Sequence, residues 1–195
     1  NMELMKQIPD KYFDISLIDP PYGININVSM GRRKNDKKST YHKFAGKDSA
    51  VPSQEFFNEL FRISQNQIIW GGNYMTEYLS PSPCWLVWDK DFSDEITFAT
   101  FELAWTSFKS SSKKFVRNSI QQDRIHPTQK PISLYSWILE KYAKEGMKIF
   151  DSHLGSGSNA IACHYAKMEF IGCELDLDYY NDSVKRIREN TRQLS

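Results

Sequence analysis

The sequence predicts an α/β fold: a doubly wound, mostly parallel, Rossmann-like sheet with an antiparallel edge hairpin, in a single domain of 195 residues. This prediction rests on two short apolar runs. Residues 15–18 are followed by Asp-Pro-Pro-Tyr, and residues 148–151 are followed by a glycine-containing loop. Apolar runs of about four to eight residues are typical of strands that are buried on both faces. Ligands of open α/β sheets bind beyond the carboxyl ends of such strands, so both loops are candidates for a functional site.

The remaining elements follow from apolar periodicity and from helix start signals. Ser53 precedes an apolar face that includes Phe56 and Leu60, which predicts a capped helix over 53–64. Strands over 85–88 and 101–106 are expected to pair antiparallel at the edge of the sheet. The other expected elements are a loop at 23–52, a strand at 67–70, a short helix at 74–79, a helix at 132–142, a helix at 159–167, a strand at 170–173 and a final helix at 179–191 that covers one face of the sheet.

The composition is that of a globular chain without a strong charge. Hydrophobic residues make up 40% of the sequence, and the formal net charge of +1 gives no overall attraction to nucleic acid, so any attraction has to be local. No apolar stretch approaches the roughly 18 residues of a membrane span, so we expect no membrane partner. We also expect no metal site, because neither the cysteines nor the histidines have zinc-like spacing: Cys84, Cys163, Cys173, His42, His126, His153 and His164.

The tetrapeptide Asp19-Pro20-Pro21-Tyr22 is the first candidate for catalysis. A strand that ends in a proline turn would explain the two prolines, but it would explain neither the acid nor the tyrosine. Asp19 and the carbonyl of Pro20 can each accept one hydrogen of an exocyclic amine, and Tyr22 can stack on the ring that carries the amine. The tetrapeptide therefore favours methyl transfer to a nucleic-acid base.

The loop after the second strand predicts a nucleotide site. Gly155 and Gly157 precede an expected helix, and Glu174 ends the next expected strand about 20 residues later. Glycines allow the backbone to approach a ligand, and an acid at this distance binds ribose hydroxyls. The third glycine of the dinucleotide fingerprint is absent, and a glycine loop that only turns a strand into a helix is the alternative.

The segment His-Pro-Thr-Gln-Lys-Pro at 126–131 opens the helix expected over 132–142. By itself it is an ordinary helix start, because proline is common at the first helical position. Together with the two loops, it makes the chain resemble the S-adenosylmethionine-dependent DNA amino-methyltransferases, in the permuted group whose catalytic half precedes the cofactor half. The resemblance covers nearly the whole chain, including residues 68–73, 85–90 and 102–106, which are similar to strands of the family.

The resemblance implies a cofactor, partners and a division of the chain. S-adenosylmethionine is the implied cofactor and double-stranded DNA the implied partner, in the cytoplasm of a bacterial or phage-infected cell, and a restriction endonuclease partner and a homodimer stay open. The implied division is a catalytic half at 14–106, a short target-recognition stretch at 107–125 and a cofactor half at 126–195. The implied cofactor-binding residues are Thr128, Lys130, Asp151, His153, Gly155, Gly157, Glu174 and Asp176.

The chain departs from the family pattern in three places. Asp151-Ser152-His153 stands where the family more often has Asp-Pro-Phe, which leaves the contacts of His153 open. A short strand and a Gly-Asp pair usually precede the catalytic half, so we expect residues upstream of Asn1. The stretch at 107–124 is short for a target-recognition region, so residues are expected to be missing there too.

A basic segment at 30–43 directly follows the tetrapeptide. Such runs are usually solvated loops, but the position beside the expected base pocket favours contacts with DNA phosphates. A second basic cluster comprises Lys109, Lys113, Lys114 and Arg117. The residues expected to bind phosphates are Arg32, Arg33, Lys34, Lys37 and Lys38.

The reaction expected from these features is methyl transfer to the N6 amine of adenine in DNA, after the base has left the helix. Adenine is favoured because the resemblance associates Asp-Pro-Pro-Tyr mainly with the adenine amine and Ser-Pro-Pro-Tyr mainly with the cytosine amine. An N4-cytosine DNA methyltransferase and a catalytically inactive DNA-binding or cofactor-binding relative are the alternatives.

Overall fold

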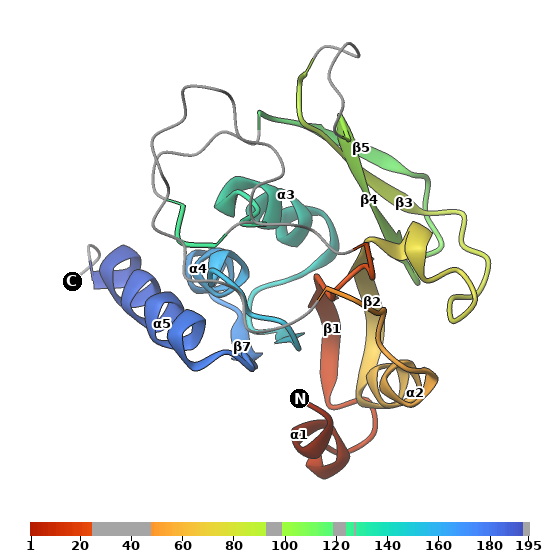
Figure 1. The fold of residues 1–195 in the computed structure, drawn as a ribbon, viewed down its shortest axis with the longest axis horizontal. Helices are drawn as coiled ribbons and strands as arrows, with labels where there is room; N and C mark the ends of the chain where they lie inside the picture. The colour runs from red at the N-terminus through yellow and green to blue at the C-terminus, as the bar shows by residue number, and fades with distance from the viewer. Residues whose placement is uncertain (25–47, 93–98, 119–123, 127, 193–195) are drawn as a thin grey trace.

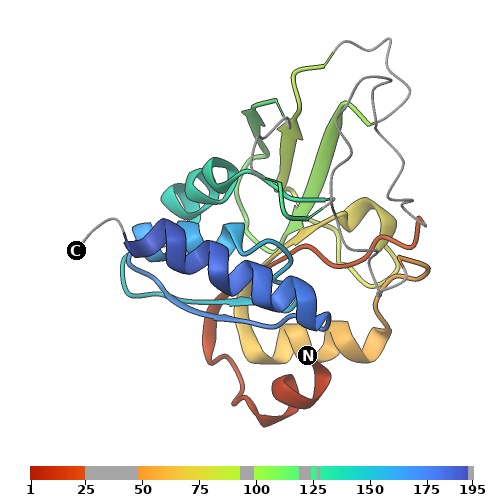
Figure 2. The ribbon, with the colours of Figure 1, turned by 60° about the vertical axis from the view of Figure 1, so that its left-hand side comes forward.

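The computed structural model describes residues 1–24, 48–92, 99–118, 124–126 and 128–192 (Figures 1 and 2). Within these residues, seven strands form one sheet in the order β5-β3-β4-β2-β1-β6-β7. Only β4 among them runs against its neighbours, because it pairs antiparallel with β2 and with β3, whereas the other pairs are parallel. The predicted fold class is therefore confirmed. The strands are β1 (Phe13–Ile18), β2 (Ser64–Trp70), β3 (Trp85–Asp89), β4 (Phe101–Thr106), β5 (Lys113–Val116), β6 (Lys148–Asp151) and β7 (Glu169–Gly172).

Helices cover both faces of the sheet, and the alternation of side chains along the strands explains why. Ile68 and Trp70 of β2 face one hydrophobic cluster, with α3 (Ile132–Tyr142) and α4 (Ser158–Tyr165), whereas Ile69 between them faces a second cluster. The second cluster contains α1 (Met2–Gln7) and α2 (Gln54–Ile63). The last helix, α5 (Leu177–Thr191), lies against α4 (Figure 1). None of the described helices is long and apolar enough to cross a membrane.

Three elements differ from the sequence-based expectation. The helix expected at 74–79 is wrong: a 3-10 turn, η1 (Gly72–Tyr74), is followed by further turns. Gly71 before it and Pro81 after it leave too few residues to offset the cost of starting an α-helix. The outer strand β5 and the helix α1 have no counterpart in the prediction, and β5 pairs parallel with β3 beyond the expected hairpin.

Strand β1 pairs with one strand from each half of the chain. It pairs parallel with β2 on one side and with β6 on the other, where Ile15 lies opposite Ile149. Because β1 and β6 are parallel neighbours, the tetrapeptide after β1 and the glycine loop after β6 leave the sheet at the same edge.

Candidate active site

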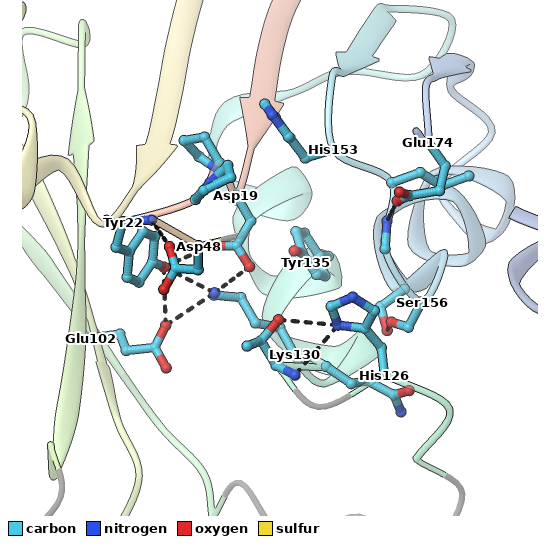
Figure 3. Close-up of a pocket in the computed structure, with 17 residues that line it drawn as sticks. Asp19, Tyr22, Asp48, Glu102, His126, Lys130, Tyr135, His153, Ser156 and Glu174 are labelled. Carbon is cyan, nitrogen blue, oxygen red and sulfur yellow. Dashed lines mark hydrogen bonds and ion pairs between the residues drawn. The ribbon is translucent and has the colours of Figure 1, made fainter. Parts of the chain in front are cut away.

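A pocket lies at this edge of the sheet (Figure 3). Its volume of about 170 Å³ is more than ten times the roughly 10–15 Å³ that one water needs, so it suits an organic ligand. The lining comes from both halves of the chain: Asp19, Pro20, Pro21, Tyr22, Asp48, Glu102, His126, Thr128, Gln129, Lys130, Tyr135, His153, Leu154, Gly155, Ser156, Ser158 and Glu174.

The Asp19 carboxylate is held by hydrogen bonds from two side chains. The Tyr22 hydroxyl donates to Oδ1 at 2.7 Å, and the Lys130 ammonium donates to Oδ2 at 2.5 Å. The turn after the strand is fixed by Asp48, whose Oδ1 accepts from the backbone amides of Tyr22 and Gly23 at 2.8 and 2.9 Å. Burial raises the pKa of Asp19, and the nearby charge of Lys130 opposes this rise.

Lys130 connects Asp19 to a second partly buried carboxylate. Only 3% of its side chain is exposed, and its ammonium group lies 3.0 Å from Glu102 Oε2 and 3.2 Å from the Tyr22 hydroxyl. Lys90 pairs with the other oxygen of Glu102 at 2.8 Å. Burial alone would raise the pKa of Glu102, but Lys130 and Lys90 lower it to about 2, so Glu102 is ionised.

The ring of Tyr22 is held between a neighbouring aromatic ring and a glycine. It stacks on Tyr74 with ring centroids 5.3 Å apart and an interplanar angle of 17°. Gly71 packs against it so closely that a Cβ there would lie 2.1 Å from Tyr22 Cε1. Gly71 also has φ +68°, which L side chains rarely adopt, so both the close contact and the backbone conformation favour glycine here.

The glycine loop and Glu174 are bonded to each other. The Gly155 amide donates to Glu174 Oε2 at 2.8 Å, and Oε1 accepts from the amides of Leu175 and Asp176 at 2.9 and 3.1 Å. Three of about four acceptor positions of this carboxylate are therefore occupied by backbone donors. Gly155 has φ +51° and lines the pocket, whereas a Cβ at Gly157 would meet Ile187 of α5 at 3.0 Å.

Two acids of the expected cofactor set do not line the pocket. Asp151 is buried behind it, where Oδ1 accepts from the His153 amide and Oδ2 from Asn159 Nδ2, both at 3.0 Å. Burial raises the pKa of Asp151 to about 7. Asp176 caps α5 by accepting from the amides of Asp178 and Tyr179 at 3.0 and 3.2 Å.

The two pocket histidines are neutral at pH 7. Burial lowers the pKa of His153 and of His126 to about 4. His153 Nδ1 lies 2.8 Å from the Ser152 hydroxyl, and its ring lies 5.6 Å from that of Phe56. His126 meets Tyr179 edge to face at 4.4 Å. His153 thus packs as a neutral aromatic group where phenylalanine is more common in the resembling family.

The pocket places many of the expected residues together, but not all of them. Asp19, Pro20, Pro21, Tyr22, Thr128, Lys130, His153, Gly155 and Glu174 line it, and Asp151, Gly157 and Asp176 do not. Arg32, Arg33, Lys34, Lys37 and Lys38 lie outside the described residues. In the second basic cluster, Lys114 pairs with Asp89 at 3.2 Å on the outer strands.

Several lining residues were not singled out from the sequence. Glu102 gave a usable signal, because it is an acid within the otherwise apolar run Phe-Glu-Leu-Ala-Trp. His126 and Gln129 belong to the 126–131 motif without having been assigned roles. Asp48, Tyr135, Leu154, Ser156 and Ser158 gave no comparable signal. Among the described residues, no group of three or more histidine, cysteine or acidic side chains could hold a metal ion.

Comparison with known proteins decides the family. A family model described as DNA methylase, of the N6/N4 type, matches residues 69–185. The chain belongs to this family. The match includes Glu102, Lys130 and the glycine loop, whereas Asp19 precedes it.

Individual relatives of this DNA methylase are distant in sequence. The Type II methyltransferase M2.MboI of Moraxella bovis is 23% identical, covering 97% of this chain and 86% of that protein. TTHA0409 of Thermus thermophilus, complexed with S-adenosyl-L-methionine, superposes with a TM-score of 0.65 at 11% identity, over 100% of this chain and 93% of that one. PvuII DNA methyltransferase (cytosine-N4-specific) superposes with a TM-score of 0.66 at 9% identity, over 98% and 89%.

S-adenosylmethionine is the cofactor of this methylase family, and DNA is its substrate. The pocket fits the cofactor chemically. Gly155 leaves room for a ligand, since the nearest atoms to a Cβ placed there, the His153 carbonyl oxygen and His126 Cε1, are 3.9 and 4.0 Å away. The Glu174 carboxylate at the other side of the loop offers an acceptor for ribose hydroxyls.

Proposed function

We propose that this DNA methylase transfers the methyl group of S-adenosylmethionine to the N6 amine of adenine in double-stranded DNA, after the base has left the helix. The observation that carries the proposal is that Asp19 and Gly155 line one pocket although they come from opposite halves of the chain. A base within a duplex cannot reach such a pocket, and unstacking it costs a few kcal/mol. Stacking on Tyr22 would return about 1–3 kcal/mol of this cost.

The proposed roles follow from the chemistry of an aromatic amine. Its lone pair is delocalised into the ring, so the nitrogen is a poor nucleophile. Asp19 and the Pro20 carbonyl would each accept one amine hydrogen and draw the nitrogen toward tetrahedral geometry. The bound cofactor supplies an electrophilic methyl group. The nitrogen would release one proton on gaining the methyl group that leaves the cofactor sulfur, and the Asp19 carboxylate would be placed to accept that proton.

The proposed cofactor contacts use the glycine loop and the groups around it. Glu174 would bind the ribose hydroxyls, with Gly155 and Gly157 allowing close approach of the backbone and Asp176 supporting the adenosine end. The family likeness assigns Asp151, His153, Thr128 and Lys130 to the remainder of the cofactor site. The position of Asp151 behind the pocket supports an indirect role, through the His153 amide.

Adenine is proposed over cytosine because the tetrapeptide begins with Asp19. Purified protein incubated with unmethylated duplex DNA and methyl-labelled S-adenosylmethionine tests this choice when the DNA is then digested to nucleosides. We expect label in N6-methyladenine for the parent and at least about 100-fold slower labelling for Asp19→Ala. Label in N4-methylcytosine would overturn the adenine assignment, and DNA binding without any transfer would favour an inactive relative.

Further expectations stay predictions, the first from the charge and position of one segment and the others from the family likeness. They are phosphate contacts from the basic segment at 30–43, a target-recognition role for residues 107–125, a homodimer, a restriction endonuclease partner and a cytoplasmic location in a bacterial or phage-infected cell.

A further inference from the structure

The Lys130 ammonium occupies an oxygen of Asp19 that the target amine would use in the proposed reaction. It donates to Asp19 Oδ2 at 2.5 Å, which is the kind of bond that the proposed reaction requires from the amine of the base. Its three N–H donors have three acceptors, on Asp19, Glu102 and Tyr22, so the group is fully paired and buried (Figure 3). An adenine amine cannot bond to the same oxygen in the same direction while Lys130 stays there.

We propose that Lys130 is a positioning residue that occupies Asp19 while the base pocket is empty and passes to Glu102 when the target amine arrives. This inference rests on the proposed function, and it assigns to Glu102 the role of second partner for Lys130. The family likeness instead placed Lys130 toward the cofactor.

The geometry makes this exchange inexpensive. Lys130 Nζ is already 3.0 Å from Glu102 Oε2, so leaving Asp19 does not leave a buried ammonium unpaired. Breaking a buried ion pair without a substitute partner costs about 3–5 kcal/mol, which base stacking alone would not supply. Glu102 is in turn held by Lys90 at 2.8 Å, so it stays in place during the exchange.

Removing the charge of Lys130 and removing the charge of Glu102 should shift the pKa of Asp19 in opposite directions. Asp19 faces Lys130, Glu102 and the Tyr22 hydroxyl, and beyond them it interacts electrostatically with Asp151 and Tyr135. Lys130 lowers the pKa of Asp19, whereas Glu102 raises it. Removing the Lys130 charge should therefore move the acid limb of the activity profile to higher pH, and removing the Glu102 charge should move it to lower pH.

The test compares Lys130→Met, Glu102→Gln and the double variant with the parent. The double variant removes one positive and one negative charge, so the net charge of the cluster stays the same. Lys167→Gln is the control, because Lys167 pairs with Glu145 on the surface with 72% of its side chain exposed. The measurements are kcat and KM for duplex DNA across pH, the cofactor Kd by calorimetry and the melting temperature.

We expect the midpoint of the acid limb to move about one pH unit higher in Lys130→Met and to move to lower pH in Glu102→Gln. At the pH optimum, Glu102→Gln should lower kcat/KM about fivefold, equivalent to about 1 kcal/mol, because the glutamine carbonyl still accepts from Lys130 but no longer carries the opposite charge. This loss should disappear in the Lys130→Met background, and cofactor Kd should not change in Glu102→Gln.

Two results would overturn the inference and leave the proposed function standing. One is that the acid limb moves in the same direction in Lys130→Met and Glu102→Gln. The other is that Glu102→Gln lowers kcat/KM equally in the parent and in the Lys130→Met background. If Lys130→Met is too unstable to assay, the Glu102→Gln profile decides alone: an acid limb that does not fall overturns the inference. A parent that transfers no methyl group to DNA would overturn the proposed function, and the inference with it.

Discussion

The backbone amide of Gly155 donates a hydrogen bond to Glu174 Oε2 at 2.8 Å, across 19 positions of the chain. The acid assigned to the cofactor ribose is thus also the group that holds the glycine loop. If Glu174 binds the ribose as proposed, cofactor binding and loop shape are coupled at this residue, and substitutions there should affect both.

Replacing Glu174 should weaken cofactor binding through both effects. Glu174→Ala is expected to cost about 1–3 kcal/mol of S-adenosylmethionine affinity, because ribose hydroxyls and three backbone amides lose their acceptor. Glu174→Gln, which keeps one oxygen acceptor, should lose less. Calorimetry with Glu145→Ala as the surface control measures the difference. Equal affinity of Glu174→Ala and parent would remove Glu174 from the cofactor site.

Gly71→Ala should abolish methyl transfer without abolishing cofactor binding. The new Cβ would lie 2.1 Å from Tyr22 Cε1, so the ring has to leave its place beside Asp19. Gly146→Ala is the matched control, because Gly146 has φ +82° and no atom within 4 Å of the added Cβ. Both variants pay about 1–2 kcal/mol for the left-handed backbone, but only Gly71→Ala displaces Tyr22. Comparable activity in the two variants would contradict this role of the Tyr22 ring.

Asp19→Ala should reduce kcat by at least about 100-fold, the loss typical of removing one group that stabilises charge in the transition state. DNA affinity should change far less, since the carboxylate acts mainly on the reacting nitrogen. Lys130 retains Glu102 as a partner, so we expect the variant to fold. Single-turnover methylation, filter binding and melting temperature separate these effects. A stable and fully active Asp19→Ala would exclude the catalytic role.

The contribution of Asp151 to stability should fall as pH rises between about 4 and about 7, whereas His126 and His153, whose pKa values are lowered to about 4, contribute in the opposite direction below about pH 6.5. The pKa of Asp151 is about 7 in the folded protein against an ordinary 3.8, so this carboxyl group binds more protons in the folded state than in the unfolded state in this range. The slope is up to about 1.4 kcal/mol per pH unit for one such group. Asp151→Asn removes this contribution and leaves those of Asp19 and the two histidines, so the stability of the parent relative to Asp151→Asn should fall as pH rises. Melting at about pH 5 and about pH 8 checks the sign. An unchanged slope in Asp151→Asn would show that Asp151 is ionised throughout.

The basic segment should control the salt dependence of DNA binding. Each of Arg32, Arg33, Lys34, Lys37 and Lys38 that contacts a phosphate contributes about 0.9 to the slope of log affinity against log salt. Neutralising all five should flatten the slope and leave the cofactor Kd unchanged. If the slope is the same in the neutralised variant, the DNA path lies elsewhere.

Short-range patterns were sufficient for most of the fold. The helix over Ile132–Tyr142 and the strand over Lys148–Asp151 begin and end where apolar periodicity placed them, because their burial is reflected directly in residue type. The outer strand β5 was missed because it has two lysines and little buried surface, so its pairing with β3 has no apolar signature. The turns after Gly71 depend on backbone conformation that composition does not reveal.

The site was harder to predict than the fold, because its chemistry depends on which distant side chains meet. Asp19 and Lys130 were both named from motifs, but their ion pair joins positions 111 apart. Glu102 was missed because its partners come from two other segments of the chain. Local sequence motifs therefore identified individual residues of the site more readily than the contacts between them.

The pairing of β1 with β6 has a consequence for when the sheet can be completed during protein synthesis. The Lys148 amide bonds to Asp14 at 2.8 Å across 134 positions, so one edge of the central strand has no partner until β6 has left the ribosome. Contacts this distant in sequence form slowly, because a long loop has to close first. A nascent chain that ends before β6 therefore has no complete pocket, because part of the lining follows this strand.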